Sequence, residues 1–249
     1  MANENIFTTK VREYAVSRPS YAPKAIDRIV STMLKEGDSI ADIGSGIGIF
    51  SKEFLLRGYE VFCVEPNDAM RLEAEKAYGG NASFHSISST AEQTNLPANS
   101  ISLVTAASAF HWFDIHSFFK ECKRILKHNG IVCIVANARI YDSFTEKQHQ
   151  ICKQYCPSYV SLTHGVDKVL RKADAFFKGD FCLERFYYPL HYTKQKFIAR
   201  SLSSSYAPEK DTDYYKGYIH SLQALLDDTF PDDGIVIEHE TVMLWGKLS

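Results

Sequence analysis

The sequence predicts an α/β fold: a doubly wound, mostly parallel sheet of seven strands with helices on both faces. Between residues 39 and 136, short apolar runs alternate with helical patterns, as strand–helix–strand units do in parallel sheets. The last of these runs, residues 131–136, is apolar throughout, which is typical of a strand covered on both faces. A glycine-rich turn, Gly44-Ser45-Gly46-Ile47-Gly48, directly follows the first run.

The elements follow from local signals. Pro23 opens the first helix, Asn67 or Asp68 can cap another, and Gly37, Gly58 and Gly79-Gly80 end helices. The expected strands are residues 39–43, 60–65, 83–88, 101–107, 131–136 and 186–192 and a strand-rich stretch at 235–248. The expected helices are residues 23–36, 50–57, 67–78, 114–127, 193–202 and 222–230.

Two segments fall outside this rhythm. Residues 6–22 are too aromatic for a plain disordered tail, and residues 140–180 look helical and irregular, with Pro157 and Gly165 as interruptions. Insertions at this edge of an α/β sheet commonly roof a pocket above the strand ends. We therefore expect a single domain over residues 1–249, in which 1–22 form a lid and 138–180 a helical cap insertion.

Composition narrows the class of partner. The chain has 249 residues, of which 45% are hydrophobic and 23% charged, with a net charge of -2, so a basic surface for nucleic acid is not expected. No apolar run approaches the roughly 18 residues that span a bilayer, and Met1 to Lys10 lack the apolar core of a secretion signal. The six cysteines show no metal-binding spacing. We expect a cytoplasmic protein, a monomer or homodimer, without a metal, nucleic acid or membrane partner.

The glycine turn indicates a ligand site. Glycines allow close backbone approach, and a following helix offers free N–H groups. A dinucleotide site would require a third glycine where Ile49 stands, and the Gly-Lys-Ser/Thr of a phosphate-binding loop is absent. Asp42, at the end of the first strand, suits a cationic ligand, and Glu65, at the end of the second, suits a ribose diol. A cation joined to a ribose describes S-adenosylmethionine.

Several motifs carry a resemblance to a known family. Asp42 to Gly48, followed by Glu65-Pro66-Asn67, resembles the class I S-adenosylmethionine-dependent methyltransferases. Ser89-Thr90-Ala91-Glu92 is similar to the family segment that meets the adenine ring. The stretch from Ala109 to Asp114, and Tyr14, Arg18, Pro19 and Tyr21, resemble the small-molecule branch that includes trans-aconitate methyltransferase-like enzymes. The resemblance covers residues 7–137 well and implies a Rossmann-like methyltransferase fold.

This resemblance implies roles for individual residues. Gly44, Ser45 and Gly46 would contact the methionine part of the cofactor, with support from Asp42, and Glu65 would hold its ribose. The remaining cofactor contacts would come from Tyr14, Tyr21, Pro66, Asn67, Met70, Thr90, Ala91, Glu92, Ser108, Phe110, Trp112 and Phe113. The family often has an acid at the position of Thr90. The threonine hydroxyl can still accept a hydrogen bond from the adenine amine. Ser108, Phe110, Trp112 and Phe113 would line the methyl-transfer end.

The function implied is transfer of a methyl group from S-adenosylmethionine to an O or N atom of a small molecule, such as a carboxylate or heterocycle, leaving S-adenosylhomocysteine. The cofactor supplies the activation, so no general base is obligatory. Arg18 is the candidate to orient an anionic acceptor, and His111 is a second candidate at the acceptor end. Two alternatives stay open: an NAD-dependent oxidoreductase, and a cofactor-binding protein without turnover.

Overall fold

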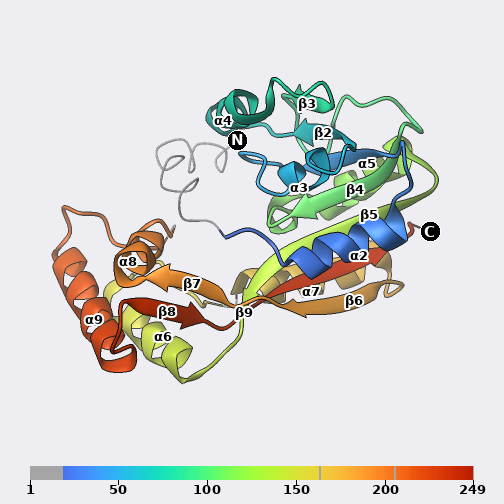
Figure 1. Cartoon of the computed structure of the whole chain (residues 1–249). Coiled ribbons are helices and arrows are strands. Elements are labelled where there is room, and N and C mark those ends of the chain that lie inside the picture. The colour runs from blue at the N-terminus through green and yellow to red at the C-terminus, as the bar shows by residue number, and fades with distance from the viewer. Residues whose placement is uncertain (1–18, 163, 205, 249) are drawn as a thin grey trace.

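A computed structural model describes residues 19–162, 164–204 and 206–248 of the chain (Figure 1). Its main sheet has seven strands in the order β3-β2-β1-β4-β5-β9-β6. Strands β3, β2, β1, β4 and β5 run parallel to their neighbours, and β9 pairs antiparallel with both β5 and β6. The strands are β1 (Ser39–Ile43), β2 (Glu60–Val64), β3 (Phe84–Ile87), β4 (Ile101–Ala107), β5 (Leu126–Arg139), β6 (Cys182–Tyr187) and β9 (His239–Gly246). The predicted fold class is confirmed.

Helices cover both faces of this sheet. One apolar core joins one face to α2 (Pro23–Met33) and α3 (Ser51–Leu55), with Tyr78 of α4 (Asp68–Tyr78) packed against it. A second core joins the other face to α5 (Ile115–Ile125) and α7 (His164–Phe177). A short 3-10 turn, η1 (Phe110–Trp112), follows β4. The carboxyl ends of β1, β2 and β4 therefore meet at one edge, where the glycine turn lies.

A second group of elements, called here the second lobe, lies below the sheet in Figure 1. Its elements are α6 (Ser143–Tyr155), β7 (Leu190–Thr193), α8 (Lys194–Leu202), α9 (Asp213–Thr229) and β8 (Gly234–Ile237), and β7 pairs with β8 in a two-stranded antiparallel sheet. Two apolar clusters of its own hold it together, one around Phe144, Phe197 and Leu226 and one around Cys152, Tyr218 and Leu222.

The predicted cap segment, residues 138–180, divides between these two parts. Helix α6 belongs to the second lobe, whereas α7 places Val169, Ala173 and Phe176 in the core beneath the sheet. The other elements of the second lobe come from residues after 188. That residues 138–180 form a cap over the active site stays a prediction. So does the division of the chain into domains, and residues 1–18 of the predicted lid lie outside the described residues.

Several element boundaries differ from expectation, and the largest differences concern three segments. The strand expected at 186–192 is two strands in different sheets, β6 and β7, because Pro189 carries no N–H and the chain changes sheets there. Strand β5 extends beyond 131–136 at both ends. Its register against β4 shifts near Ile101, and Asn129 in its first part has φ +66°. Helix α9 begins nine residues earlier than predicted.

Candidate functional site

The glycine turn lies against the end of β2. The backbone amides of Gly44 and Ser45 both donate to the carbonyl of Val64, at 2.8 and 3.2 Å. Gly44, Gly46 and Gly48 have φ values of +69°, +59° and +82°, a region that side chains with a Cβ rarely adopt. The turn is thus held to the neighbouring strand while its backbone follows a path that only glycine follows without strain.

Glu65 links the turn to the start of α4. One carboxylate oxygen accepts from the Gly46 amide at 2.9 Å, and the other accepts from the Asn67 amide at 2.9 Å. The side chain of Asn67 in turn caps α4 by accepting from the amide of Met70 at 3.0 Å. The structure therefore brings together the predicted residues Gly46, Glu65, Asn67 and Met70, with Pro66 between them in the chain.

Asp42 is fully buried below the turn. Its carboxylate accepts from the hydroxyl of Ser51 on α3 at 2.5 Å and from that of Thr105 on β4 at 2.8 Å. Burial raises the pKa of Asp42 to about 6, and the charge of Glu65 acts in the same direction, against the two hydroxyls. Asp42 has no exposed surface. Its action on a ligand is therefore indirect, through the position of α3 and through its charge.

Gly44 also joins the turn to the segment after β4. A Cβ added at Gly44 would lie 2.5 Å from the Cβ of Ala109 and 3.3 Å from the Phe113 ring. This close approach places Ala109 and Phe113 beside the glycine turn. Trp112 is 46% exposed, and its ring lies 4.8 Å from that of His111.

The structure corrects the assignment of Phe110. Its ring is 1% exposed and packs against Phe113, Phe118 and Phe176, at 6.3, 6.1 and 5.4 Å between centroids. The 3-10 turn directs this side chain into the core between α5 and α7. Phe110 therefore supports the segment from below and does not line the methyl-transfer end.

Ser108 lies at the junction between β4 and this turn. It has φ +55°, an uncommon value for a serine, and its amide donates to the Val135 carbonyl at 2.7 Å. The hydroxyl of Tyr21 donates to that of Ser108 at 3.0 Å, and the Tyr21 ring packs edge-on against Phe50. The structure thus brings two predicted site residues, Tyr21 and Ser108, into direct contact.

In the predicted adenine segment, Thr90 to Glu92 contact other parts of the chain. Ala91 is buried, Thr90 is exposed and forms a bridge to Gln93, and Glu92 accepts from the Asp114 amide at 3.0 Å. Glu92 thereby holds the segment to the start of α5. Contact of these three residues with a ligand stays a prediction. Tyr14 and Arg18 lie outside the described residues.

Sequence reasoning missed four residues that shape the site. Ser51 and Thr105 hold Asp42, as described above. Lys172 of α7 donates to the carbonyls of His111 and Phe113, at 3.1 and 2.7 Å, and so fixes the aromatic turn from a helix 60 residues further along the chain. Glu121 of α5 accepts from the amide and hydroxyl of Thr94, at 2.8 and 2.6 Å. For Lys172 and Glu121, the one sequence signal is a charged residue within an otherwise apolar helix pattern. Ser51 and Thr105 carry no such signal.

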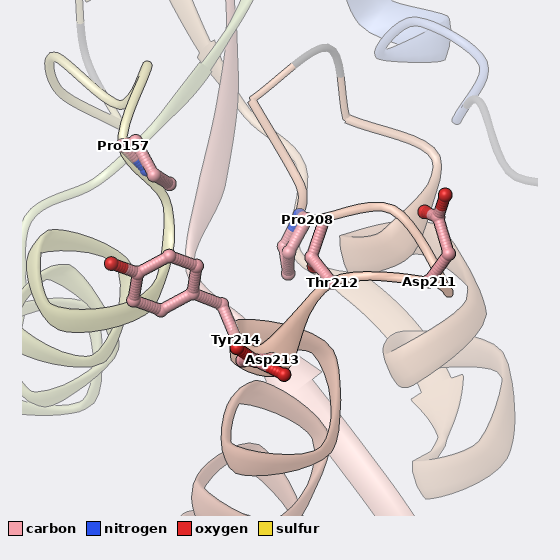
Figure 2. Close-up of a pocket in the computed structure, with 6 residues that line it drawn as sticks. All are labelled: Pro157, Pro208, Asp211, Thr212, Asp213 and Tyr214. Carbon is pink, nitrogen blue, oxygen red and sulfur yellow. The ribbon is translucent and has the colours of Figure 1, made fainter.

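A shallow cavity of about 400 Å³ lies elsewhere, in the second lobe (Figure 2). Pro157, Pro208 and the stretch Asp211 to Tyr214 line it, and none of these residues belongs to the glycine turn or its neighbours. Asp211, Asp213 and Tyr214 are exposed. The cavity therefore adds no group with unusual chemistry to the site.

Within the described residues, no cluster of three or more histidine, cysteine or acidic side chains could hold a metal ion. In the same part of the chain, no helix combines the length and apolar character that crossing a bilayer requires.

Comparison with known proteins agrees with this geometry. Residues 41–134 match the family described as "Methyltransferase domain". A protein of Dictyostelium discoideum named as a methyltransferase is 32% identical over 123 residues, covering 49% of this chain and 45% of the relative. An uncharacterized methyltransferase of Mycobacterium tuberculosis is 31% identical over 133 residues, covering 53% of this chain and 52% of the relative. The chain thus spans about half the length of these curated relatives.

Solved structures show the same fold. A type II methyltransferase, so named, from Anaeromyxobacter dehalogenans superposes with a TM-score of 0.69 at 18% identity, covering 92% of this chain and 97% of the other. Phosphoethanolamine N-methyltransferase 2 of Haemonchus contortus, solved with phosphomonomethylethanolamine and S-adenosylhomocysteine, has a TM-score of 0.54 at 18% identity, covering 97% and 57%. The chain therefore has a Rossmann-like methyltransferase fold, and its residues 41–134 match the methyltransferase domain family.

Proposed function

We propose that this chain is an S-adenosylmethionine-dependent methyltransferase. One observation carries the proposal: the Glu65 carboxylate is fastened by the amides of Gly46 and Asn67 beside the glycine turn, at the edge where three strands end. Each carboxylate oxygen can accept further hydrogen bonds beyond those two. A diol placed there would donate both hydroxyls to an acceptor that the backbone already holds in position.

Two features of the turn fit this cofactor. The Ser45 hydroxyl is buried and has no hydrogen-bond partner among the residues that the structure describes, so a bound polar group would satisfy it. Within that part of the chain, a Cβ added at Gly46 would meet only the Met70 sulfur, at 3.7 Å, so the turn leaves room for atoms close to its backbone. The negative charges of Asp42 and Glu65 favour a cation nearby.

In this proposal, Gly44, Ser45 and Gly46 hold the methionine part and Glu65 the ribose. Pro66, Asn67, Met70, Thr90, Ala91 and Glu92 border the adenosine, and Tyr14, Tyr21, Ser108, Trp112 and Phe113 surround the reacting end. When bound, S-adenosylmethionine supplies a methyl group already activated by its sulfonium charge. The chain contributes position and exclusion of water, and no residue is assigned as a general base.

The acceptor proposed is a small molecule that receives the methyl group on O or N, such as a carboxylate or heterocycle. Support comes from the resemblance of the turn after β4 to the trans-aconitate methyltransferase-like branch. The Haemonchus contortus enzyme of similar fold was likewise solved with a small molecule. Arg18 and His111 are proposed to position the acceptor.

Calorimetric titration with S-adenosylhomocysteine and with NAD⁺ tests the proposal. We expect binding of the first and none of the second, and Glu65→Ala should weaken binding at least tenfold by removing the ribose acceptor. Glu73→Ala, which removes an acid of α4 that pairs with Lys76, is the control and should bind as the parent does. Absence of binding to S-adenosylhomocysteine would overturn the proposal.

Binding without turnover is the remaining alternative. Transfer of labelled methyl from S-adenosylmethionine to a pool of small carboxylates and amines separates the two. We expect labelled product, and tight cofactor binding with no product from a broad pool would favour the binding protein.

A further inference from the structure

Arg139 is the last residue of β5 and pairs in register with His239, the first residue of β9. Strands β5 and β9 run from the sheet towards the second lobe (Figure 1). There the Arg139 guanidinium lies over the rings of Phe144 on α6 and Phe197 on α8, at 5.2 and 5.9 Å from their centroids. A cationic side chain thus lies at the junction between the two parts of the molecule.

The hydrogen bonds of this guanidinium are incomplete. Its Nη1 donates to the side-chain carbonyl of Gln148, which is itself buried. Its Nε and Nη2 are buried and have no hydrogen-bond partner, and no acid among residues 19–162, 164–204 and 206–248 forms an ion pair with it. The carboxylate of Asp142 instead caps α6, accepting from the Thr145 amide at 2.7 Å.

A buried guanidinium with unpaired N–H groups destabilises the fold unless a ligand accepts hydrogen bonds from them. A buried guanidinium without a direct ion pair is rare, because desolvation of the charge exceeds what two aromatic rings return. Burial lowers the pKa of Arg139 to about 10, the charge of Asp142 opposes this shift, and the charge of Arg200 adds to it. The side chain therefore stays charged at neutral pH.

The unpaired donors have a particular geometry. The Nε–H and one Nη2–H of an arginine point in parallel along one edge of the guanidinium, and this fork matches the two oxygens of a carboxylate or phosphate. His239 lies opposite Arg139 in the strand register and is 4% exposed, and its buried Nδ1 has no hydrogen-bond partner among the described residues. In the tautomer protonated on Nδ1, a neutral imidazole adds a third donor.

We propose that Arg139 and His239 form an oxyanion subsite that binds the carboxylate or phosphate group of the methyl acceptor. This assignment rests on the proposed function. Its place along β5 supports it: the Val135 carbonyl, four residues earlier, accepts from the amide of Ser108, beside the proposed methyl-transfer end. Four strand residues span about 13 Å, so the anionic group would lie at the far end of an elongated acceptor.

Titration of the full chain with citrate and with inorganic phosphate, at constant ionic strength and with S-adenosylhomocysteine present, tests the subsite. Citrate tests whether the subsite binds a carboxylate, and inorganic phosphate tests whether it binds a phosphoryl group. We expect at least one anion to bind, with a loss of tenfold or more in Arg139→Met and less than twofold change in affinity for S-adenosylhomocysteine. Arg185→Met is the control, because Arg185 is exposed on β6 and pairs with Glu240.

Two further measurements protect the test against misfolding of the variant. Arg139→Lys keeps the charge but lacks the fork, and it should bind the anion weakly. In the unmodified protein, bound citrate or phosphate should slow reaction of phenylglyoxal with Arg139, followed by peptide mass spectrometry.

The outcomes separate the two proposals. Binding of S-adenosylhomocysteine with no bound anion, or with anion binding unchanged in Arg139→Met and Arg139→Lys, overturns the subsite and leaves the proposed function standing. Failure of S-adenosylhomocysteine to bind overturns the proposed function and, with it, the assignment of this subsite to an acceptor.

Discussion

At the residue scale, Gly44 and the buried Asp42 affect the glycine turn through different physical terms. Gly44 is required by both conformation and space, since its φ is positive and Ala109 lies where a Cβ would be. Neither backbone conformation nor space requires Asp42. Burial of its carboxylate costs desolvation free energy, which the hydrogen bonds from two hydroxyls only partly offset. These two residues give separate predictions.

Gly44→Ala should destabilise the fold and weaken cofactor binding. A methyl group at 2.5 Å from Ala109 must displace the segment after β4, and we expect a loss of about 2–4 kcal/mol in unfolding free energy. Gly58→Ala is the matched control, because Gly58 has φ +81° but no atom within 4 Å of its added Cβ, so only backbone strain of about 1 kcal/mol applies. Equal losses in urea denaturation would contradict the packing argument.

Asp42 should make stability depend on pH. Its folded pKa of about 6 exceeds the ordinary value of 3.8, so the folded state binds the proton more tightly than the unfolded state does. As pH rises from 4 to 6, this residue should therefore cost about 2–3 kcal/mol of unfolding free energy. Asp42→Asn should remove that dependence. The measurement is the difference in unfolding free energy between the two proteins at pH 4, 5, 6 and 7, and a constant difference would refute the prediction.

At the element scale, α7 stabilises the turn after β4 although it lies far away in the sequence. The Lys172 ammonium donates to two carbonyls of that turn, and its aliphatic stem reaches them from a helix whose other face is in the core. The helix therefore supports the turn after β4 and is more than a cover for the sheet.

Lys172→Met should loosen the aromatic turn without unfolding the sheet. Loss of two hydrogen bonds from a charged donor should cost about 1–3 kcal/mol. We expect S-adenosylhomocysteine affinity to fall several-fold and Trp112 fluorescence to shift. Lys147→Met, at an exposed ion pair with Asp228, should change neither quantity. An unaltered affinity in Lys172→Met would show that the turn is held by its other contacts.

The elements with strong local signals were predictable and the others were not. Pro23, Asn67, Asp114 and Thr193 open or cap helices as expected, because their effects act within one turn of chain. The division of residues 186–192 between two sheets depends on partners about 50 residues away, β9 and β8, which periodicity does not report. The same holds at the site: Glu65 and the turn were recognisable, whereas Lys172 and Arg139 gain their meaning only from distant segments.

At the scale of the whole molecule, the sheet and the second lobe have separate apolar cores. The sheet core joins seven strands to helices on both faces, whereas the lobe relies on two smaller clusters and a two-stranded sheet. Regions with less buried apolar contact open at lower free energy.

Native-state hydrogen exchange should therefore divide the chain into two units. Amides in β4, β5 before residue 136, and β9 after residue 241 should exchange slowest, and those of β7 and β8 should exchange at least tenfold faster. Added S-adenosylhomocysteine should slow exchange of the amides of residues 44–48 and 65–67 most. Equal protection of the sheet and the second lobe would mean that they unfold as one unit.

The pairing of β5 with β9 continues without a break from Val132 to Arg139, and the Ile140 amide then donates to the Glu238 carbonyl. On the other edge of β9, the pairing with β6 runs to Glu240, and the Tyr188 amide donates to the His239 carbonyl. The second lobe is thus joined to the sheet by paired strands, which resist stretching much more than a single strand of chain would. If both proposals hold, the span between the methyl-transfer end and the Arg139 subsite is set by a count of strand residues. The enzyme would then select acceptors by molecular length, and an analogue one bond shorter or longer would lose turnover even with its charge intact.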